Sequence, residues 1–225
     1  MIFVARLSLI VFDLDGTLID SRKDLSDSAN TLLRAHGGSP LSDDRIADMV
    51  GGGALLLIRR VFAAAGLGEP PPSALPAFLD IYDERLLAHT RPYDGVADVL
   101  AALHRQFPLA VLTNKPLAHT QRILDELGFS PYFRWVLGGD DPIGRKPAPA
   151  GLRRLMEDAR ATADACLMVG DSAIDLETAR NAGTRICLAR YGFGYRFGPD
   201  DLRGDELIVD RPEDLLRIVA SVNRG

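Results

Sequence analysis

Two aspartates stand two residues apart, Asp13 and Asp15, directly after a short apolar segment of the sequence. Two later apolar segments also end in polar residues, and a lysine stands in a loop between them. These further residues are Thr113, Asn114, Lys146, Asp171 and Asp175. One carboxylate can act as a nucleophile, and a second can donate and accept a proton. The residue types are therefore those needed to transfer an anionic group.

The carboxylates need a positive partner if the fold brings them together, because like charges disfavour each other's ionised form. A shared cation removes that conflict, and oxygen ligands favour a hard ion such as Mg²⁺. Lys146 offers a further positive charge toward an anionic substrate. Thr113, Asn114 and backbone amides near Gly16 and after Asn114 offer donors to phosphate oxygens. The set predicts a phosphoryl site.

A mechanism follows from the same residues. Asp13 attacks phosphorus and forms an aspartyl phosphate. Asp15 protonates the leaving alkoxide and later takes a proton from the water that hydrolyses the intermediate. Mg²⁺ and Lys146 neutralise charge on the transferred group, and Gly16 allows the backbone to pass close to it.

The elements that must position these residues are strands alternating with helices. The predicted strands are 8–12, 109–113, 135–137, 166–169, 185–188 and 207–209, and the helices between and after them begin near 96, 117, 149, 174 and 212. This alternation predicts an α/β fold with a doubly wound parallel sheet, similar to a Rossmann fold. Open sheets of this kind bind ligands at the carboxyl ends of their strands, where the polar residues stand.

Residues 22–90 interrupt this pattern with helices alone. Helical spacing of apolar residues predicts helices from about Asp24, after Ser42, over 54–65 and over 74–89. We therefore expect an α/β core of residues 1–21 and 91–225, with an all-helical domain of residues 22–90 inserted after the first strand. The junctions near 16–22 and 88–95 are expected to act as hinges.

Composition narrows the functional class. The 225 residues are 47% hydrophobic and carry a net charge of −5, with no basic face that would predict a nucleic-acid partner. No apolar run is long enough to span a membrane, and the N-terminus does not resemble a signal peptide, so we expect a cytoplasmic protein. Cys166 and Cys187 stand in apolar segments and are expected to be buried and free. A monomer or a homodimer is expected.

Four motifs occur in order along the chain and resemble those of the haloacid dehalogenase superfamily. They are Asp-Leu-Asp-Gly-Thr-Leu at 13–18, Thr-Asn-Lys at 113–115, Arg-Lys-Pro at 145–147 and Gly-Asp-Ser-x-x-Asp at 170–175. The resemblance spans nearly the whole chain. It is strongest to the superfamily's phosphatases with a helical cap of the C1 type inserted after the first strand.

The resemblance implies a role for each residue. Asp13 would be the nucleophile, Asp15 the acid and base, and Lys146 the group that steadies the intermediate. Thr113 and Asn114 would bind phosphate together with Lys146. Mg²⁺ would be held by Asp13, by the backbone carbonyl of Asp15 and by Asp171, with Asp175, Gly16 and Thr17 in supporting positions.

Within that superfamily the bacterial phosphoglycolate phosphatases are the most similar, which implies 2-phosphoglycolate as a substrate. The sequence departs from them at Ala148, where histidine is common, and at 51–53, a Gly-Gly-Gly segment expected to face the substrate. Another metabolite, such as a sugar phosphate or a nucleotide, stays open, as does a phosphosugar mutase. Asp15 argues against a dehalogenase, which lacks the second aspartate, and the complete motif set argues against a non-catalytic relic.

Several residues have two interpretations. Arg59 and Arg60 either bind an anionic substrate or lie in solvent. Lys115 is compatible with a surface position at the start of a helix. Trp135 is expected in the core. The glycines of the segment 191–194 either shape the rim of the pocket or form a simple turn.

Overall fold

A computed structural model describes residues 6–198 and 200–223. Residues 1–5 and 224–225, the two ends of the expected core domain, lie outside the described residues. The prediction that the N-terminus is not a signal peptide falls mostly on these residues. The strands are β1 (Leu9–Phe12), β2 (Ile19–Asp20), β3 (Arg91–Pro92), β4 (Leu109–Leu112), β5 (Phe133–Leu137), β6 (Cys166–Gly170), β7 (Arg185–Ala189) and β8 (Leu207–Val209). The α-helices are α1 (Arg22–Ala35), α2 (Asp43–Ala47), α3 (Ala54–Ala64), α4 (Ala74–Arg85), α5 (Val96–Leu103), α6 (Leu117–Glu126), α7 (Ala150–Ala159), α8 (Ala173–Ala182) and α9 (Asp214–Val222). Two short 3₁₀ helices cover Ser130–Tyr132 and Ala163–Ala165.

The described residues form a six-stranded sheet with the order β5-β4-β1-β6-β7-β8, and every pairing in it is parallel. The chain builds outward from β1 in one direction and then in the other, so β1 lies between β4 and β6. The expected doubly wound α/β sheet is confirmed. This order brings the carboxyl ends of β1, β4 and β6 together at a topological switch point, where such sheets bind ligands.

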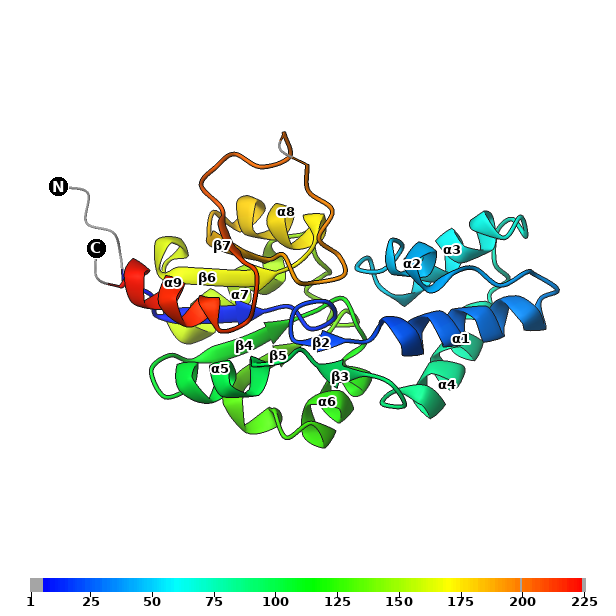
Figure 1. Cartoon of the computed structure of the whole chain (residues 1–225), viewed down its shortest axis with the longest axis horizontal. Coiled ribbons are helices and arrows are strands. Elements are labelled where there is room, and N and C mark those ends of the chain that lie inside the picture. Colours follow the sequence, from blue (N-terminus) through cyan, green and yellow to red (C-terminus); the bar gives the residue numbers. More distant parts are fainter. Residues whose placement is uncertain (1–5, 199, 224–225) are drawn as a thin grey trace.

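Both faces of the sheet are covered by helices (Figure 1). Along β1 the side chains alternate between two apolar clusters, as the two-residue repeat of a strand requires. Ile10 and Phe12 belong to the cluster that includes residues of α5, α6 and α9, whereas Leu9 and Val11 belong to the cluster that includes α7 and α8. All four side chains are buried, which explains why this strand reads as a continuous apolar run.

Helices α1 to α4 form a separate layer beside the carboxyl ends of the strands, at the right of Figure 1. We call residues 22–90 the helical segment. Its predicted helices are present, although α4 ends at Arg85 rather than continuing to His89. Ser42 accepts a hydrogen bond from the Arg45 backbone amide and caps α2, as its position predicted.

The two junctions of the helical segment pair with each other. Strand β2 lies in the first junction and β3 in the second, and they form a two-stranded antiparallel ladder with Ile19 opposite Pro92. The sequence did not predict this ladder, because two-residue strands carry no periodic signal. It fixes the entry and exit of the helical segment side by side.

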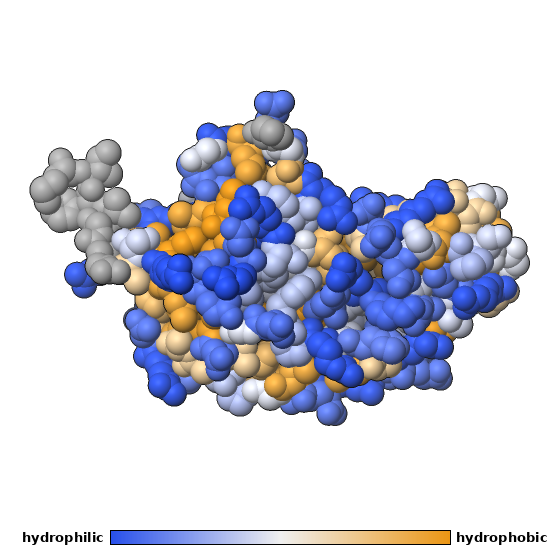
Figure 2. Space-filling model, viewed as in Figure 1, coloured by the Kyte–Doolittle hydropathy of each residue, from blue (hydrophilic) through white to orange (hydrophobic). Residues whose placement is uncertain are grey.

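The remaining expectations concern the surface and the thiols. Hydrophilic residues cover most of the face in Figure 2, between smaller apolar patches. Among the described residues, no helix combines the length and apolar character needed to cross a bilayer. Cys166 and Cys187 are buried and free as predicted, and burial raises the pKa of each thiol to about 12. The cytoplasmic location and the oligomeric state stay predictions.

Candidate active site

Asp13 lies directly after β1, with only 6% of its surface exposed. One of its carboxylate oxygens, Oδ1, is 2.7 Å from the Lys146 ammonium. Burial raises the pKa of Asp13 to about 7; Lys146 opposes that rise and the nearby Asp175 carboxylate adds to it. Asp13 is therefore a buried carboxylate with a single close cation, in a position where more positive charge would favour its ionised form.

Lys146 bridges two carboxylates. Its Nζ is 2.7 Å from Oδ1 of Asp13 and 2.7 Å from Oδ1 of Asp175. Burial would lower the pKa of Lys146, but the two carboxylates outweigh it and raise the pKa above its ordinary value. The backbone amide of Lys146 donates to Oδ1 of Asn114, which anchors the loop to the end of β4. The ammonium is consequently charged and fixed.

Asp171 follows β6 and is buried, but no cation lies against it among the described residues. Its Oδ2 accepts a 2.7 Å hydrogen bond from the Gly194 amide, and its Oδ1 lies 3.4 Å from the Thr17 hydroxyl. Burial and the charges of Asp175 and Asp13 raise the pKa of Asp171 well above its ordinary value. Its direct hydrogen-bond partners among the described residues are thus neutral donors, and Lys146 acts on it only from a distance.

Gly16 is required for this approach. Its φ is +86°, and a Cβ at this position would overlap the Asp171 carboxylate. Glycine adopts such a φ readily and leaves the space free. The turn after β1 can therefore pass directly against Asp171.

Asp175 supports the site from the start of α8. Its Oδ2 accepts from the Ser172 amide and hydroxyl, at 3.0 and 2.6 Å, and from the Asp171 amide at 3.2 Å. The Ser172 side chain accepts from the Asp175 amide in return, which completes a capping box. With its Oδ1 on Lys146, both oxygens of Asp175 are occupied. Asp175 therefore caps the helix and also positions the lysine.

The carboxylates suit a divalent cation. Asp13, Asp171 and Asp175 each offer an oxygen, and these atoms lie within 4.8 Å of one another. Asp175 is committed to Lys146 and the capping box, which leaves Asp13 and Asp171 as the available carboxylate ligands. An all-oxygen donor set is the type that Mg²⁺ prefers, and such an ion would give Asp171 the direct positive partner that it lacks among the described residues.

Asp15 has partners of its own. Its Oδ1 and Oδ2 are each 2.8 Å from the Lys115 ammonium, and Oδ1 also accepts a 2.5 Å hydrogen bond from the Ser21 hydroxyl. Lys115 makes a third contact, of 2.8 Å, with the Tyr82 hydroxyl of α4. The carboxylates of Asp13 and Asp15 thus form ion pairs with different lysines.

Thr113 and Asn114 lie at the end of β4 beside this pair. The Thr113 hydroxyl accepts from the Lys115 amide at 3.2 Å. The Asn114 amide group donates to the carbonyl oxygens of Gly51 and Lys146, each at 2.9 Å. Asn114 therefore connects β4, the Lys146 loop and the Gly-Gly-Gly segment of the helical segment.

A cavity of about 50 Å³ lies between the strand ends and the helical segment. The polar residues that line it are Asp13, Asp15, Tyr82, Thr113, Asn114 and Lys115. The helical segment contributes a largely apolar wall, formed by Leu25, Val50, Gly51, Gly53, Ala54, Leu57, Phe78 and Leu79 beside Tyr82. Because a single water needs at least about 10–15 Å³ of such space, the cavity is small in this arrangement.

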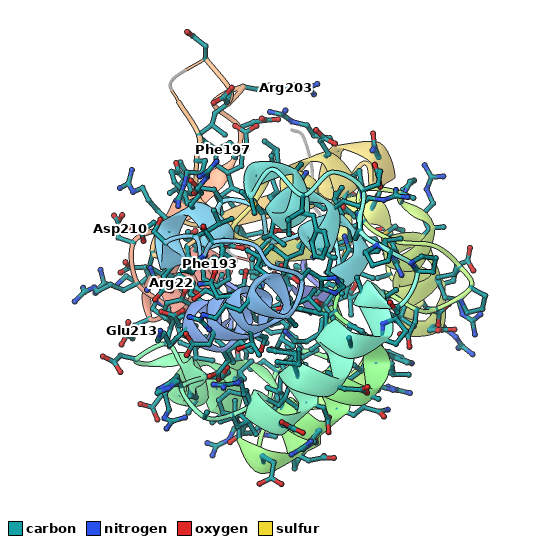
Figure 3. All side chains as sticks on the ribbon, turned by 90° about the vertical axis from the view of Figure 1, so that its right-hand side faces the viewer. Arg22, Phe193, Phe197, Arg203, Asp210 and Glu213 are labelled. Carbon is teal, nitrogen blue, oxygen red and sulfur yellow. The ribbon has the colours of Figure 1, made fainter. Side chains whose placement is uncertain are left out.

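Ionic contacts hold the helical segment over the strand ends. Arg196 lies 2.7 Å from Asp48 of the helical segment, and Arg122 of α6 lies 2.9 Å from Asp83 of α4. At the start of α1, the Arg22 guanidinium lies 5.8 Å from the centroid of the Phe193 ring, and these two side chains are labelled in Figure 3. The segment 191–196 therefore contacts both Asp171 and the helical segment. The glycines of the segment 191–194 belong to the site rather than to an isolated turn.

Arg59 and Arg60 do not line the cavity. The Arg59 guanidinium lies 3.5 Å from Glu69 on the exposed surface, and Arg60 donates to the Met49 carbonyl oxygen. Trp135 was expected in the core; it is partly buried and packs against the edge of the apolar cluster beneath α7 and α8.

Residues 10–189 match the family described as haloacid dehalogenase-like hydrolase. The match covers most of the chain. This chain belongs to that family. The resemblance inferred from the four motifs is confirmed, and the enzyme is of the phosphoric monoester hydrolase class.

Relatives of this haloacid dehalogenase-like hydrolase include two proteins of Pseudomonas aeruginosa. Phosphoglycolate phosphatase 1 is 37% identical, over 95% of this chain and 80% of the relative. N-acetylmuramic acid 6-phosphate phosphatase is 33% identical, over 95% of each. The crystal structure of a "predicted phosphoglycolate phosphatase" from Haemophilus somnus 129PT superposes with a TM-score of 0.87 and 32% identity, covering 95% of this chain and 98% of that one.

Sequence reasoning missed two residues of the site. Lys115, which was compatible with a surface position, is 6% exposed and forms an ion pair with Asp15. Its place directly after Asn114, at a strand end that already carried candidate residues, was a usable signal. Tyr82 gave no signal, because α4 resembles an ordinary amphipathic helix. Only its contact with α6, where the Tyr82 ring lies 5.5 Å from the His119 ring, brings the hydroxyl to Lys115.

Proposed function

We propose that this hydrolase is a Mg²⁺-dependent phosphatase that removes the phosphoryl group of a small organic ester through an aspartyl phosphate on Asp13. One observation carries the proposal. Asp13 and Asp15 face one cavity with separate partners, Asp13 with Lys146 and Asp15 with Lys115. Two carboxylates in different surroundings can take different roles at one phosphorus atom.

In the first step an oxygen of Asp13 attacks phosphorus, and the bond from phosphorus to the ester oxygen breaks. Asp15 in its acid form gives its proton to the departing alkoxide. In the second step water attacks the phosphorus of the aspartyl phosphate and gives a proton to Asp15. The bond between phosphorus and Asp13 breaks, inorganic phosphate leaves, and both carboxyl groups return to their starting forms.

Lys146 neutralises charge on the transferred group, because it lies beside the attacking oxygen and is held charged by its two carboxylates. Thr113 is proposed to contact the phosphate through its hydroxyl and Asn114 through its backbone amide, because the Asn114 side chain is bonded to Gly51 and Lys146. Gly16 and Thr17 are proposed to shape the phosphate site. Mg²⁺ would be held by Asp13, Asp171 and the backbone carbonyl of Asp15, and would supply charge stabilisation and keep Asp13 ionised.

Residues 22–90 are proposed to act as a cap domain on the core of residues 1–21 and 91–225. The paired junctions β2 and β3 support this division, since they confine the connection to two adjacent strands. Exposed ion pairs such as Arg196 with Asp48 are weak individually, so they permit the cap to open and admit substrate.

The first candidate substrate is 2-phosphoglycolate, because the cavity is small and Phosphoglycolate phosphatase 1 is among the relatives. A second candidate is N-acetylmuramic acid 6-phosphate. The apolar wall formed by Leu57, Phe78 and Leu79 suits the methyl groups of that sugar better than it suits glycolate, and one relative carries that activity in its name.

The test is a panel of phosphate esters assayed with Mg²⁺ for release of inorganic phosphate. It contains 2-phosphoglycolate, N-acetylmuramic acid 6-phosphate, glucose 1-phosphate, a nucleoside monophosphate and p-nitrophenyl phosphate. A kcat/KM for 2-phosphoglycolate at least about tenfold above the others supports the first candidate. Conversion of glucose 1-phosphate into an isomer without phosphate release would identify a mutase and contradict the hydrolase proposal.

A further inference from the structure

Tyr82 is the one residue of the helical segment that places a side-chain hydroxyl at the cavity, among the described residues that line it. Its ring is buried, with 2% of its surface exposed, and stacks on Phe78 of the same helix with centroids 6.0 Å apart. The hydroxyl lies 2.8 Å from the Lys115 ammonium. A group of the helical segment thus reaches the catalytic end of the core.

Lys115 uses its three N–H groups on three oxygens. Two are the carboxylate oxygens of Asp15 and the third is the Tyr82 hydroxyl, each at 2.8 Å. The side chain of Lys115 is 4% exposed, so water cannot easily replace a lost partner. A buried donor left without a partner is unfavourable, and the ammonium would move to satisfy it.

Asp15 depends on this ammonium for its orientation. Its carboxylate has two side-chain partners, Lys115 and the Ser21 hydroxyl, which lies at the start of α1. Ser21 lies in the junction that leads into the helical segment, and Tyr82 lies within that segment. The position of the carboxylate therefore depends on where that segment sits.

Building on the proposed function, we propose that Tyr82 is a positioning residue that couples the seated helical segment to the acid and base Asp15 through Lys115. When the segment closes, the Tyr82 hydroxyl fixes Lys115, and Lys115 holds the Asp15 carboxyl group beside the cavity. In the acid form one oxygen of Asp15 keeps the contact with Lys115 and the other carries the proton toward the ester oxygen. When the segment opens, that hydroxyl withdraws and Asp15 loses its alignment. The acid is thus in place only when the cavity is closed.

The leaving group separates this role from a general contribution to binding or folding. A glycolate alkoxide needs a proton from Asp15 as it departs, whereas p-nitrophenolate is a weak base and departs without one. The quantity to compare is kcat/KM, because it includes the phosphoryl transfer step and not the later hydrolysis of the aspartyl phosphate. If Asp15 loses its alignment, kcat/KM should fall for alkyl esters and not for p-nitrophenyl phosphate.

The experiment measures Tyr82→Phe, which keeps the ring and removes the hydroxyl. We expect kcat/KM for the best alkyl substrate of the panel to fall on the order of tenfold, which is less than the full contribution of a general acid. The kcat/KM for p-nitrophenyl phosphate should stay within about twofold. Tyr132→Phe, a hydroxyl deletion on the opposite end of the sheet, is the matched control and should change neither value. Thermal unfolding of both variants checks the fold.

A double-mutant cycle with Lys115→Met tests the route of the effect. Tyr82→Phe should have no further effect in the Lys115→Met background. If Lys115→Met does not fold, the comparison of leaving groups alone decides. Equal losses on the alkyl and aryl esters overturn the proposal, as does an unchanged kcat/KM for the alkyl ester. A wild-type protein without Mg²⁺-dependent activity on any ester would overturn the proposed function itself.

Discussion

Lys146 is an intermediary between Asp13 and Asp175, with its Nζ 2.7 Å from an oxygen of each. Asp13 follows β1, Lys146 stands in a loop before α7, and Asp175 lies in the first turn of α8. The lysine therefore joins three elements that are far apart in the sequence. Its single positive charge is shared between two carboxylates, and Asp171 has no direct cationic partner among the described residues, so a net negative charge is left for a metal ion to neutralise.

Asp13→Asn is expected to lower kcat on the order of 10³-fold or more, because an amide oxygen is a poor nucleophile. The fold should persist, since Asn fills the same volume and removes a charge that burial disfavours. The measurement is release of p-nitrophenol with Mg²⁺, together with a thermal unfolding curve. Activity close to that of the wild type would refute the assignment of the nucleophile.

Removal of the metal with EDTA is expected to abolish turnover, and added Mg²⁺ should restore it. Mg²⁺ should also raise the Tm of the metal-free protein, because a ligand that binds only the folded state stabilises it. Asp171→Asn should raise the Mg²⁺ concentration needed for half of the full effect at least about tenfold, both for activity and for Tm. An unchanged rate in EDTA, or a Tm shift that survives Asp171→Asn, would contradict the proposed metal site.

Arg59→Ala is expected to leave kcat/KM for 2-phosphoglycolate within about twofold of the wild type, because its contact with Glu69 is an exposed ion pair. The sequence alone allowed Arg59 to bind an anionic substrate. A KM raised tenfold for 2-phosphoglycolate and unchanged for p-nitrophenyl phosphate would restore that interpretation, and would mean that α3 moves when substrate binds.

Glu206 gives a stability test away from the site. Burial acts to raise its pKa, but the Arg180 guanidinium and the amides of Arg203 and Gly204 outweigh it and lower the pKa to about 2. Because the folded-state pKa lies below the unfolded value of 4.5, the carboxylate stabilises the fold at pH above 4.5. That contribution is lost as the pH falls toward 2.

Glu206→Gln should therefore lower Tm at pH 7, and its difference from the wild type should shrink steadily below pH 4.5. Glu177→Gln, on the exposed face of α8, serves as the control and should show no such trend. A Tm difference that stays constant down to pH 3 would mean that the effect of Glu206 does not come from its charge.

The strand-end residues could be predicted because the signal lies in short, contiguous stretches. An apolar run that ends in Asp13 predicts a buried strand with a carboxylate at its end, and parallel strands bring such ends to one edge. The same reasoning placed Asp171 and Thr113 correctly at that edge. Arg59 could not be placed, since a helix pattern predicts its apolar face but not which neighbour its polar face meets.

The sequence by itself therefore determined the α/β fold, the helical insertion and the set of residues at the strand ends, because each depends on local periodicity and chain order. Only the tertiary structure decided how their charges are shared. It paired Asp13 with Lys146 and Asp15 with Lys115, and it brought Tyr82 to the second pair. The reason is that these partners are joined through space by packing of α4 and the loops on the core, and no local pattern in the chain records that packing.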